Sequence, residues 1–223
     1  MQPDLLLFAK QPVAGQVKTR LQPKCNPQQA ACIAGYLVRA TCELAVKYWP
    51  GSVYLYTWPN SDHPLFGELA DQFPITLAVQ SDGDLGAKMI AALEEGIGRS
   101  GGAAVMGCDV PHCPGGILVR ASEHLCAGEE ILGPCNDGGY YLIGLNKSSA
   151  HLFADMDWGG DKIASKTLFR AKQDGRHLNL LPQLRDIDTW EDLNTVAEHH
   201  TPLRQFMTNE IDTPIHPKII LRE

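Results

Sequence analysis

Residues 5–21 read LLLFAKQPVAGQVKTRL, an apolar run of strand length followed by a loop that holds Lys10, Gly15, Lys18 and Arg20. A continuous apolar run is typical of a buried parallel strand, and the loop after such a strand lies where open α/β sheets bind ligands. Loop N–H groups, lysine ammonium groups and the arginine guanidinium all attract phosphate oxygens, so the stretch predicts a phosphate-binding loop. A solvated basic loop is the alternative that these residues leave open.

Strand and helix patterns alternate along the rest of the chain. Strands are expected at 4–9, 52–58, 75–79, 101–108, 130–133, 140–145 and 177–181. Helices are expected at 28–47, 63–72, 116–127, 148–155, 161–174, from 85 onward and after 189. This alternation predicts a doubly wound α/β sheet in residues 1–200. Prolines and weak periodicity from residue 201 predict a tail, residues 201–223, packed on that domain.

Composition narrows the class of ligand. The chain has 223 residues, is 44% hydrophobic and carries a net charge of −7, which argues against a nucleic-acid surface and favours a small anionic ligand. Seven cysteines form an odd set without a C-x-x-C pair, so we expect reduced thiols in the cytoplasm and no zinc site. No secretory signal or membrane-spanning run is recognisable.

Two aspartates follow strand patterns. Asp109 comes directly after the apolar run that ends at Cys108, at the edge where an α/β sheet binds ligands. Asp137 belongs to the turn Asn136-Asp137-Gly138-Gly139, which a plain hairpin explains fully. Alternatively, Asp137 projects a carboxylate into the ligand crevice, and the glycines let a substrate approach the backbone.

Two further turns precede helices. Asp84, with Leu85 and Gly86 after it, is either an ordinary helix N-cap or part of a nucleotide pocket. Asp186 and Asp188 stand before the helix that follows residue 189, where they are free to face a metal.

Five motifs occur in a specific order: the basic loop, GDLG (83–86), CDVP (108–111), DGGYYLIGL (137–145) and DIDTWEDL (186–193). Together they resemble the nucleotide-diphospho-sugar transferase (GT-A) superfamily, and within it a bacterial group described as glycosyltransferases. The loop with Lys18-Thr19-Arg20-Leu21 also resembles phospholactate guanylyltransferases and sugar-nucleotide pyrophosphorylases. The sequence departs from the pyrophosphorylase pattern, because Lys10 and Gln11 replace consecutive glycines in the first loop, and it has no D-x-D triplet at Asp109, which Gly107-Cys108 precede.

The resemblance implies a Rossmann-like, three-layer α/β/α sandwich with a mixed, mostly parallel sheet. A nucleotide is expected over its first half and an acceptor over its second. The implied nucleotide-binding residues are Lys10, Gly15, Lys18, Arg20, Asp84, Leu85 and Gly86; the acceptor-binding residues are Asp137, Gly138, Gly139 and Tyr140. Asp109 and Asp188, the latter favoured over Asp186, match the ligands of a divalent metal, Mg²⁺ or Mn²⁺.

The resemblance leaves three functions open. The first is glycosyl transfer from a nucleotide-diphospho-sugar to a small acceptor, with Asp137 as the base. The second is nucleotidyl transfer, in which an acceptor phosphate attacks a nucleoside triphosphate while Lys18 and Arg20 hold the leaving pyrophosphate. The third is a nucleotide-binding module without catalysis. Glycosyl transfer is the first expectation, and metal-dependent transfer from a nucleotide donor is common to the first two.

Overall fold

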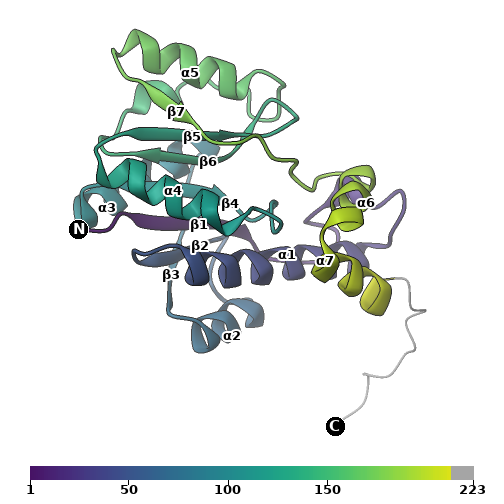
Figure 1. Cartoon of the computed structure of the whole chain (residues 1–223). Helices are drawn as coiled ribbons and strands as arrows, with labels where there is room; N and C mark the ends of the chain where they lie inside the picture. The colour runs from purple at the N-terminus through teal and green to yellow at the C-terminus, as the bar shows by residue number, and fades with distance from the viewer. Residues whose placement is uncertain (212–223) are drawn as a thin grey trace.

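The computed structural model describes residues 1–211, and one seven-stranded mixed sheet organises them (Figure 1). Its strands are β1 (Asp4–Lys10), β2 (Val53–Trp58), β3 (Ile75–Val79), β4 (Ala103–Gly107), β5 (Glu130–Pro134), β6 (Tyr140–Leu145) and β7 (Leu178–Leu180). Their order across the sheet is β3-β2-β1-β4-β6-β5-β7. Strand β6 runs antiparallel to β4 and β5, whereas the other neighbouring pairs are parallel. The expected fold class, a mixed and mostly parallel α/β sheet, is confirmed.

Helices cover both faces of this sheet. They are α1 (Pro27–Tyr48), α2 (Pro64–Gln72), α3 (Leu85–Ser100), α4 (Gly115–Cys126), α5 (Ile163–Gln173), α6 (Trp190–His199) and α7 (Thr201–Phe206), with the short turns η1 (Thr19–Leu21), η2 (Ala150–Leu152) and η3 (Met207–Ile211). Helices α1, α2 and α4 pack on one face and α3 and α5 on the other. None of these helices, all within residues 1–211, is both long and apolar enough to cross a lipid bilayer.

The leucine run of β1 lies at the centre of the molecule. Leu5 and Leu7 point into the core under α1, α2 and α4, and Leu6 points into the core under α3 and α5. All three are fully buried, because β1 lies between β2 and β4 and both of its faces are covered. This explains why the run is continuously apolar rather than alternating.

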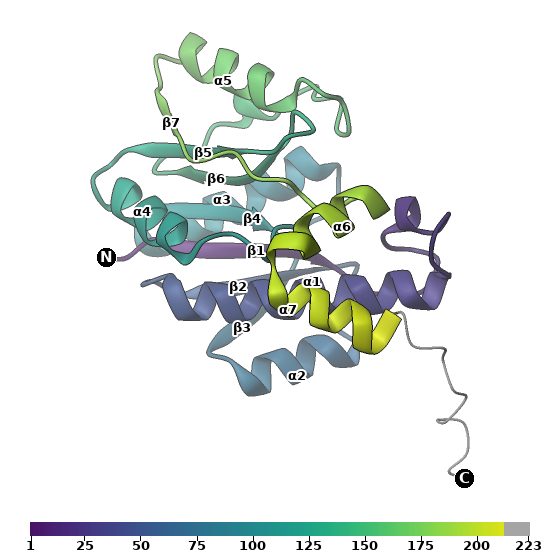
Figure 2. The same cartoon turned by 45° about the vertical axis from the view of Figure 1, so that its right-hand side comes forward.

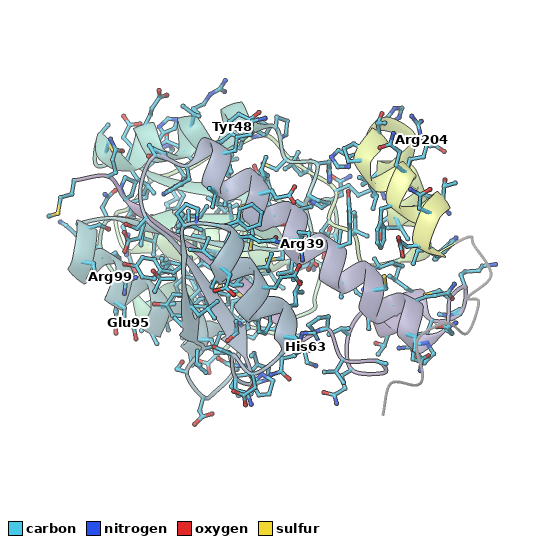
Figure 3. The ribbon with its side chains drawn as sticks, turned by 90° about the horizontal axis from the view of Figure 1, so that it is seen from below. Arg39, Tyr48, His63, Glu95, Arg99 and Arg204 are labelled. Atoms are coloured by element: carbon cyan, nitrogen blue, oxygen red, sulfur yellow. The ribbon has the colours of Figure 1, made fainter. Side chains whose placement is uncertain are left out.

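Helix α1 is the longest helix described, and its start is encoded locally. Asn26 accepts a hydrogen bond from the Gln29 N–H at 2.8 Å, while the Gln29 side chain accepts one from the Asn26 N–H at 3.0 Å. This capping box satisfies two amide groups that the first turn leaves free. Farther along, Arg39 donates to Glu68 and Gln72 and so ties α1 to α2 (Figure 3).

A third core cluster lies beyond the carboxyl edge of β1. It joins Leu21 of the loop after β1 to Ile33 and Leu37 of α1, to Ile187, and to Leu193 of α6. Figure 2 shows α6 and α7 beside α1 at this end of the molecule. The cluster therefore fastens the loop after β1 to the loop that precedes α6.

Two local expectations need correction. The helix expected at 148–155 is only the short turn η2, and residues 153–158 form a loop. Leu152 and Phe153, the apolar residues that suggested a helix, are instead buried in the core under α3 and α5. Residues 201–211, expected to be irregular, form α7 and η3; the His200 side chain accepts the Leu203 N–H, and Phe206 stacks on Tyr36 with ring centroids 4.2 Å apart. The domain boundary at residue 200 stays a prediction, and residues 212–223 lie outside the described part of the chain.

Candidate functional site

Lys18 connects three loops at the carboxyl edge of the sheet. Its backbone is left-handed, with φ 46° and ψ 40°, an uncommon conformation for a residue other than glycine. Its Nζ lies 2.7 Å from Asp109 Oδ1, donates to the Ile187 carbonyl at 2.7 Å, and lies 3.9 Å from Asp188 Oδ1. The side chain is only 11% exposed, so the ammonium group is held in place between two carboxylates.

Arg20 completes this arrangement from the solvent side. Its guanidinium pairs with Asp188 Oδ2, and the side chain is 68% exposed. The Ile187 N–H donates to the Asp109 carbonyl at 2.9 Å, which fastens the loop before α6 to the end of β4. The structure thus brings together the predicted catalytic cations, Lys18 and Arg20, with the predicted metal ligands, Asp109 and Asp188.

The donor set suits a hard divalent cation. Asp109 and Asp188 offer carboxylate oxygens, which Mg²⁺ and Mn²⁺ prefer. The position between them already holds a positive charge, the Lys18 ammonium. A metal ion bound there would displace the ammonium, which would then be free to contact a phosphate.

A second group of ligand atoms lies next to this pair. One ligand atom from each of Cys135, Asp137 and Asp186 lies within 4.8 Å of the others. Burial, followed by the nearby Asp137 carboxylate, raises the pKa of Asp186 to about 6; Asp109 and Asp188 add to the rise. Burial also raises the pKa of Cys135, as do the nearby carboxylates of Asp186 and Asp137, so its thiol stays protonated.

Several other predicted residues have local structural partners. The Asp84 carboxylate caps α3 by accepting the Ala87 N–H at 2.8 Å, and Lys10 donates to the Gln16 carbonyl at 2.9 Å. Gly15, with φ +81°, turns the loop after β1 and lies in open space. Their predicted contacts with a nucleotide stay predictions.

Gly138, one of the predicted acceptor-binding residues, packs closely against another segment. A side chain at Gly138 would place its Cβ 1.9 Å from the Asp161 carbonyl oxygen, so the loop before α5 occupies that space. The Asp137 carboxylate accepts the Gly139 N–H at 2.8 Å, as in an ordinary turn. Asp137 also faces Asp186, so the turn and a crevice-facing carboxylate are compatible at this residue.

Gly86 and Leu85 begin α3 beside the second half of the sheet. A Cβ at Gly86 would lie 2.9 Å from the Phe153 carbonyl oxygen and 3.0 Å from the Trp158 ring. Leu85 is 43% exposed and, together with Tyr140, lines a cavity. Leu85, predicted to contact the nucleotide, and Tyr140, predicted to contact the acceptor, thus line one cavity, and both contacts stay predictions.

Sequence reasoning missed three residues. Cys135 was treated only as a reduced thiol, although it follows β5 and therefore lies at the same sheet edge as Asp109. Lys88 and Trp58 were also missed: the Lys88 ammonium lies 3.2 Å from the centroid of the Trp58 ring. Burial lowers the pKa of Lys88, and the Lys10 charge lowers it further. Trp58 ends β2, a position that could have indicated proximity to this edge.

Solved structures that are similar to this chain include the following three. A protein from Desulfovibrio desulfuricans G20, named as a proposed nucleotide-diphospho-sugar transferase, aligns with a TM-score of 0.76 and 26% identity over 94% of this chain and 88% of that chain. Rv0371c from Mycobacterium tuberculosis H37Rv, solved in complex with manganese, gives a TM-score of 0.55 and 18% identity over 90% of this chain and 100% of its own. A nucleotidyl transferase from Methanothermobacter thermautotroptrophicus gives a TM-score of 0.52 and 16% identity over 88% of this chain and 97% of its own.

These similarities confirm the resemblance to the nucleotide-diphospho-sugar transferase superfamily and its fold. The two structures below 25% identity show the shared fold alone. No curated protein matches the sequence. A family model described as "Uncharacterized protein conserved in bacteria (DUF2064)" matches residues 41–160, more than half of the chain. The chain therefore belongs to the DUF2064 family of bacterial proteins.

Proposed function

We propose that this protein is a divalent-metal-dependent transferase that uses a nucleotide donor. The observation that carries the proposal is the convergence of Lys18, Arg20, Asp109 and Asp188, from three loops, at one edge of the sheet. Carboxylates hold a metal and cations hold phosphate oxygens, and a metal–nucleotide complex requires both side by side. A purely structural ion pair would need only one cation and one carboxylate.

Nucleotidyl transfer is the version that this geometry supports best. An acceptor phosphate oxygen forms a bond to the α-phosphorus of a nucleoside triphosphate, the bond from that phosphorus to the bridging oxygen breaks, and pyrophosphate leaves. Lys18 and Arg20 stabilise the charge that grows on the leaving pyrophosphate. The metal ion, when bound to Asp109 and Asp188, supplies additional charge neutralisation. Two cations beside the metal ligands fit this larger anionic leaving group.

Glycosyl transfer is the second candidate, and one observation favours it. The D. desulfuricans protein, named as a proposed nucleotide-diphospho-sugar transferase, is 26% identical over nearly the whole chain. In this version Asp137 accepts the proton of an acceptor hydroxyl, and Lys18 and Arg20 stabilise a departing nucleoside diphosphate. Both versions use the same donor site and differ in the bond that breaks.

The experiment that tests the proposal is a thermal-shift panel followed by product analysis. Nucleoside triphosphates and nucleotide sugars are each added with and without Mg²⁺ or Mn²⁺, since a ligand of the native state raises the unfolding midpoint. A metal-dependent shift strongest for one triphosphate, with pyrophosphate released on turnover, supports nucleotidyl transfer. A shift strongest for one nucleotide sugar, with nucleoside diphosphate released, supports glycosyl transfer. No shift with any nucleotide would overturn the proposal.

Asp109→Asn provides the matched variant for this panel. The substitution keeps the side-chain volume but removes a carboxylate that faces Lys18. We expect turnover to fall at least about a hundredfold, the range seen when one preorganised electrostatic group is removed. Unfolding midpoints in the absence of ligand should stay close to wild type, because Asp109 is about half exposed. Undiminished metal-dependent turnover would contradict the metal assignment.

A further inference from the structure

A cavity of about 160 Å³ lies on the α3 and α5 side of the sheet. Its wall consists mainly of aromatic and aliphatic side chains. Gly107, at the end of β4, and Gly139, in the turn before β6, also line it. Its lining includes Phe8, Leu85, Gly107, Tyr140 and Trp158. No charged side chain lies among the lining residues, all of which belong to the described part of the chain.

This apolar cavity adjoins the charged edge of the sheet. Gly107, which ends β4, lines the cavity two residues before Asp109. Gly139 lines it as well, and its N–H binds the Asp137 carboxylate at 2.8 Å. A ligand with one apolar end and one charged end could therefore place the first in the cavity and the second at the cations and carboxylates.

The wall chemistry distinguishes a ring from a sugar. A sugar would bring several hydroxyl groups, and each one buried without a partner costs roughly 1–3 kcal/mol. Tyr140 also lines the cavity, and its buried hydroxyl has no hydrogen-bond partner among residues 1–211. Trp158 Nε1 is buried and has no hydrogen-bond partner among the described residues, so it can donate one hydrogen bond to a ligand. Two unpartnered polar groups in otherwise apolar walls fit a compact planar ring with one or two polar atoms.

We propose that the acceptor of this transferase carries a compact apolar ring, which binds in this cavity while its reacting phosphate lies at the adjoining carboxyl edge of the sheet, next to the donor held by Lys18 and Arg20. The proposal rests on the proposed function and names the chemical class of its acceptor. It assigns substrate selection to Phe8, Tyr140 and Trp158.

Gly107 allows the cavity to be filled without disturbing the fold. A Cβ at this position would meet no heavy atom within 4 Å, and Gly107 points to the same face of β4 as Val105. Valine suits a strand, so Gly107→Val should fold and occupy the cavity. The matched control is Gly98→Ala on α3, where a Cβ also meets nothing within 4 Å.

The probes are benzyl alcohol and glucose, which carry no phosphate and therefore report on the cavity alone. Binding is followed by the indole N–H signal of Trp158 in ¹⁵N NMR spectra, assigned with Trp158→Phe. We expect benzyl alcohol to shift this signal saturably in wild type and Gly98→Ala, and at least about tenfold more weakly in Gly107→Val, because the valine fills the site. Glucose should bind much more weakly than benzyl alcohol.

Three outcomes would overturn this inference: tighter binding of glucose, equal binding of benzyl alcohol by Gly107→Val and wild type, or no binding of benzyl alcohol. The metal-dependent nucleotide shift, measured on the same samples, separates this inference from the proposed function. If benzyl alcohol binds as expected but no nucleotide raises the unfolding midpoint, the proposed function is contradicted. The preference of the cavity for a ring over a sugar is then still established. A normal nucleotide shift without ring binding contradicts the acceptor class alone.

Discussion

Asp186 shows how one residue's surroundings set its charge. It is half-buried, it lies beside the buried Cys135 thiol, and three other aspartates lie close enough to oppose its ionisation. Its pKa therefore rises from 3.8 to about 6. Lys18 and Arg20 pair instead with Asp109 and Asp188, so Asp186 has no cation partner within residues 1–211. An ionised Asp186 consequently lowers the stability of the metal-free protein.

Asp186→Asn should stabilise the metal-free protein at pH 7.5 by about 1–2 kcal/mol. The rise in pKa alone corresponds to about 3 kcal/mol, and solvent screening of this half-buried group reduces that value. Between pH 4 and 6 the native state holds more protons than the unfolded state, so wild-type stability falls as the pH rises through this window. At pH 4 the carboxyl is largely protonated in the native state, and the benefit of the asparagine should largely disappear. Urea unfolding at both pH values measures the difference.

The control for this measurement is Asp71→Asn, at an exposed position on α2. It should alter stability by less than about 0.5 kcal/mol at either pH, as exposed substitutions do. A stabilisation by Asp186→Asn that is the same at pH 4 and pH 7.5 would show that the raised pKa is not its cause.

At the scale of secondary-structure elements, the N-terminus of a helix positions a residue of the candidate site. Helix α6 begins at Thr189, directly after Asp188, with a capping box formed by Thr189 and Asp192. Helix α1 begins with a second capping box, formed by Asn26 and Gln29. The two capping boxes should contribute similar free energies to folding, but only the one at α6 is next to a proposed metal ligand, Asp188.

Thr189→Ala should lower the free energy of unfolding by about 1 kcal/mol and weaken Mn²⁺ binding several-fold, because the loop that carries Asp188 loses its anchor. Asn26→Ala should lower stability by a similar amount and leave Mn²⁺ binding unchanged. Urea unfolding and calorimetric titration with Mn²⁺ measure the two effects. Equal Mn²⁺ affinities in both variants would contradict a positioning role for the α6 cap.

At the scale of the whole molecule, the core clusters have different relations to the site. Leu21 and Ile187 are fully buried in the cluster beyond the carboxyl edge of β1, and each is adjacent in sequence to a charged residue of the site, Arg20 and Asp188. Leu93 is equally buried but lies in the cluster under α3 and α5. The first cluster thus holds two halves of the site together, whereas Leu93 supports the sheet.

Leu21→Ala and Leu93→Ala should each lower the free energy of unfolding by about 2–5 kcal/mol, the cost of truncating a buried leucine. Only Leu21→Ala should also weaken Mn²⁺ binding, by about tenfold, because its cluster aligns the loops that carry Lys18 and Asp188. Titration at 15 °C keeps both variants folded during the measurement. A loss of Mn²⁺ affinity that simply follows the loss of stability in both variants would contradict this division of roles.

Much of the fold could be predicted from local patterns. Strands β3 and β6 have the predicted bounds, and α1 begins one residue before its predicted start, because strand periodicity and capping residues are local in sequence. The segment 148–155 was predicted wrongly, since its apolar residues Leu152 and Phe153 are buried by tertiary packing rather than by a helix of their own.

For the site, the sequence by itself determined which residues follow the strands and therefore lie at one edge: Lys18, Arg20, Asp109 and the DIDT loop. Only the tertiary structure decided which charges pair. It paired Asp188 with Arg20, joined Asp186 to Cys135 and Asp137, and left an apolar cavity beside them. The physical reason is that strand position follows from local periodicity, whereas partnership depends on distances of a few ångströms between loops far apart in the chain.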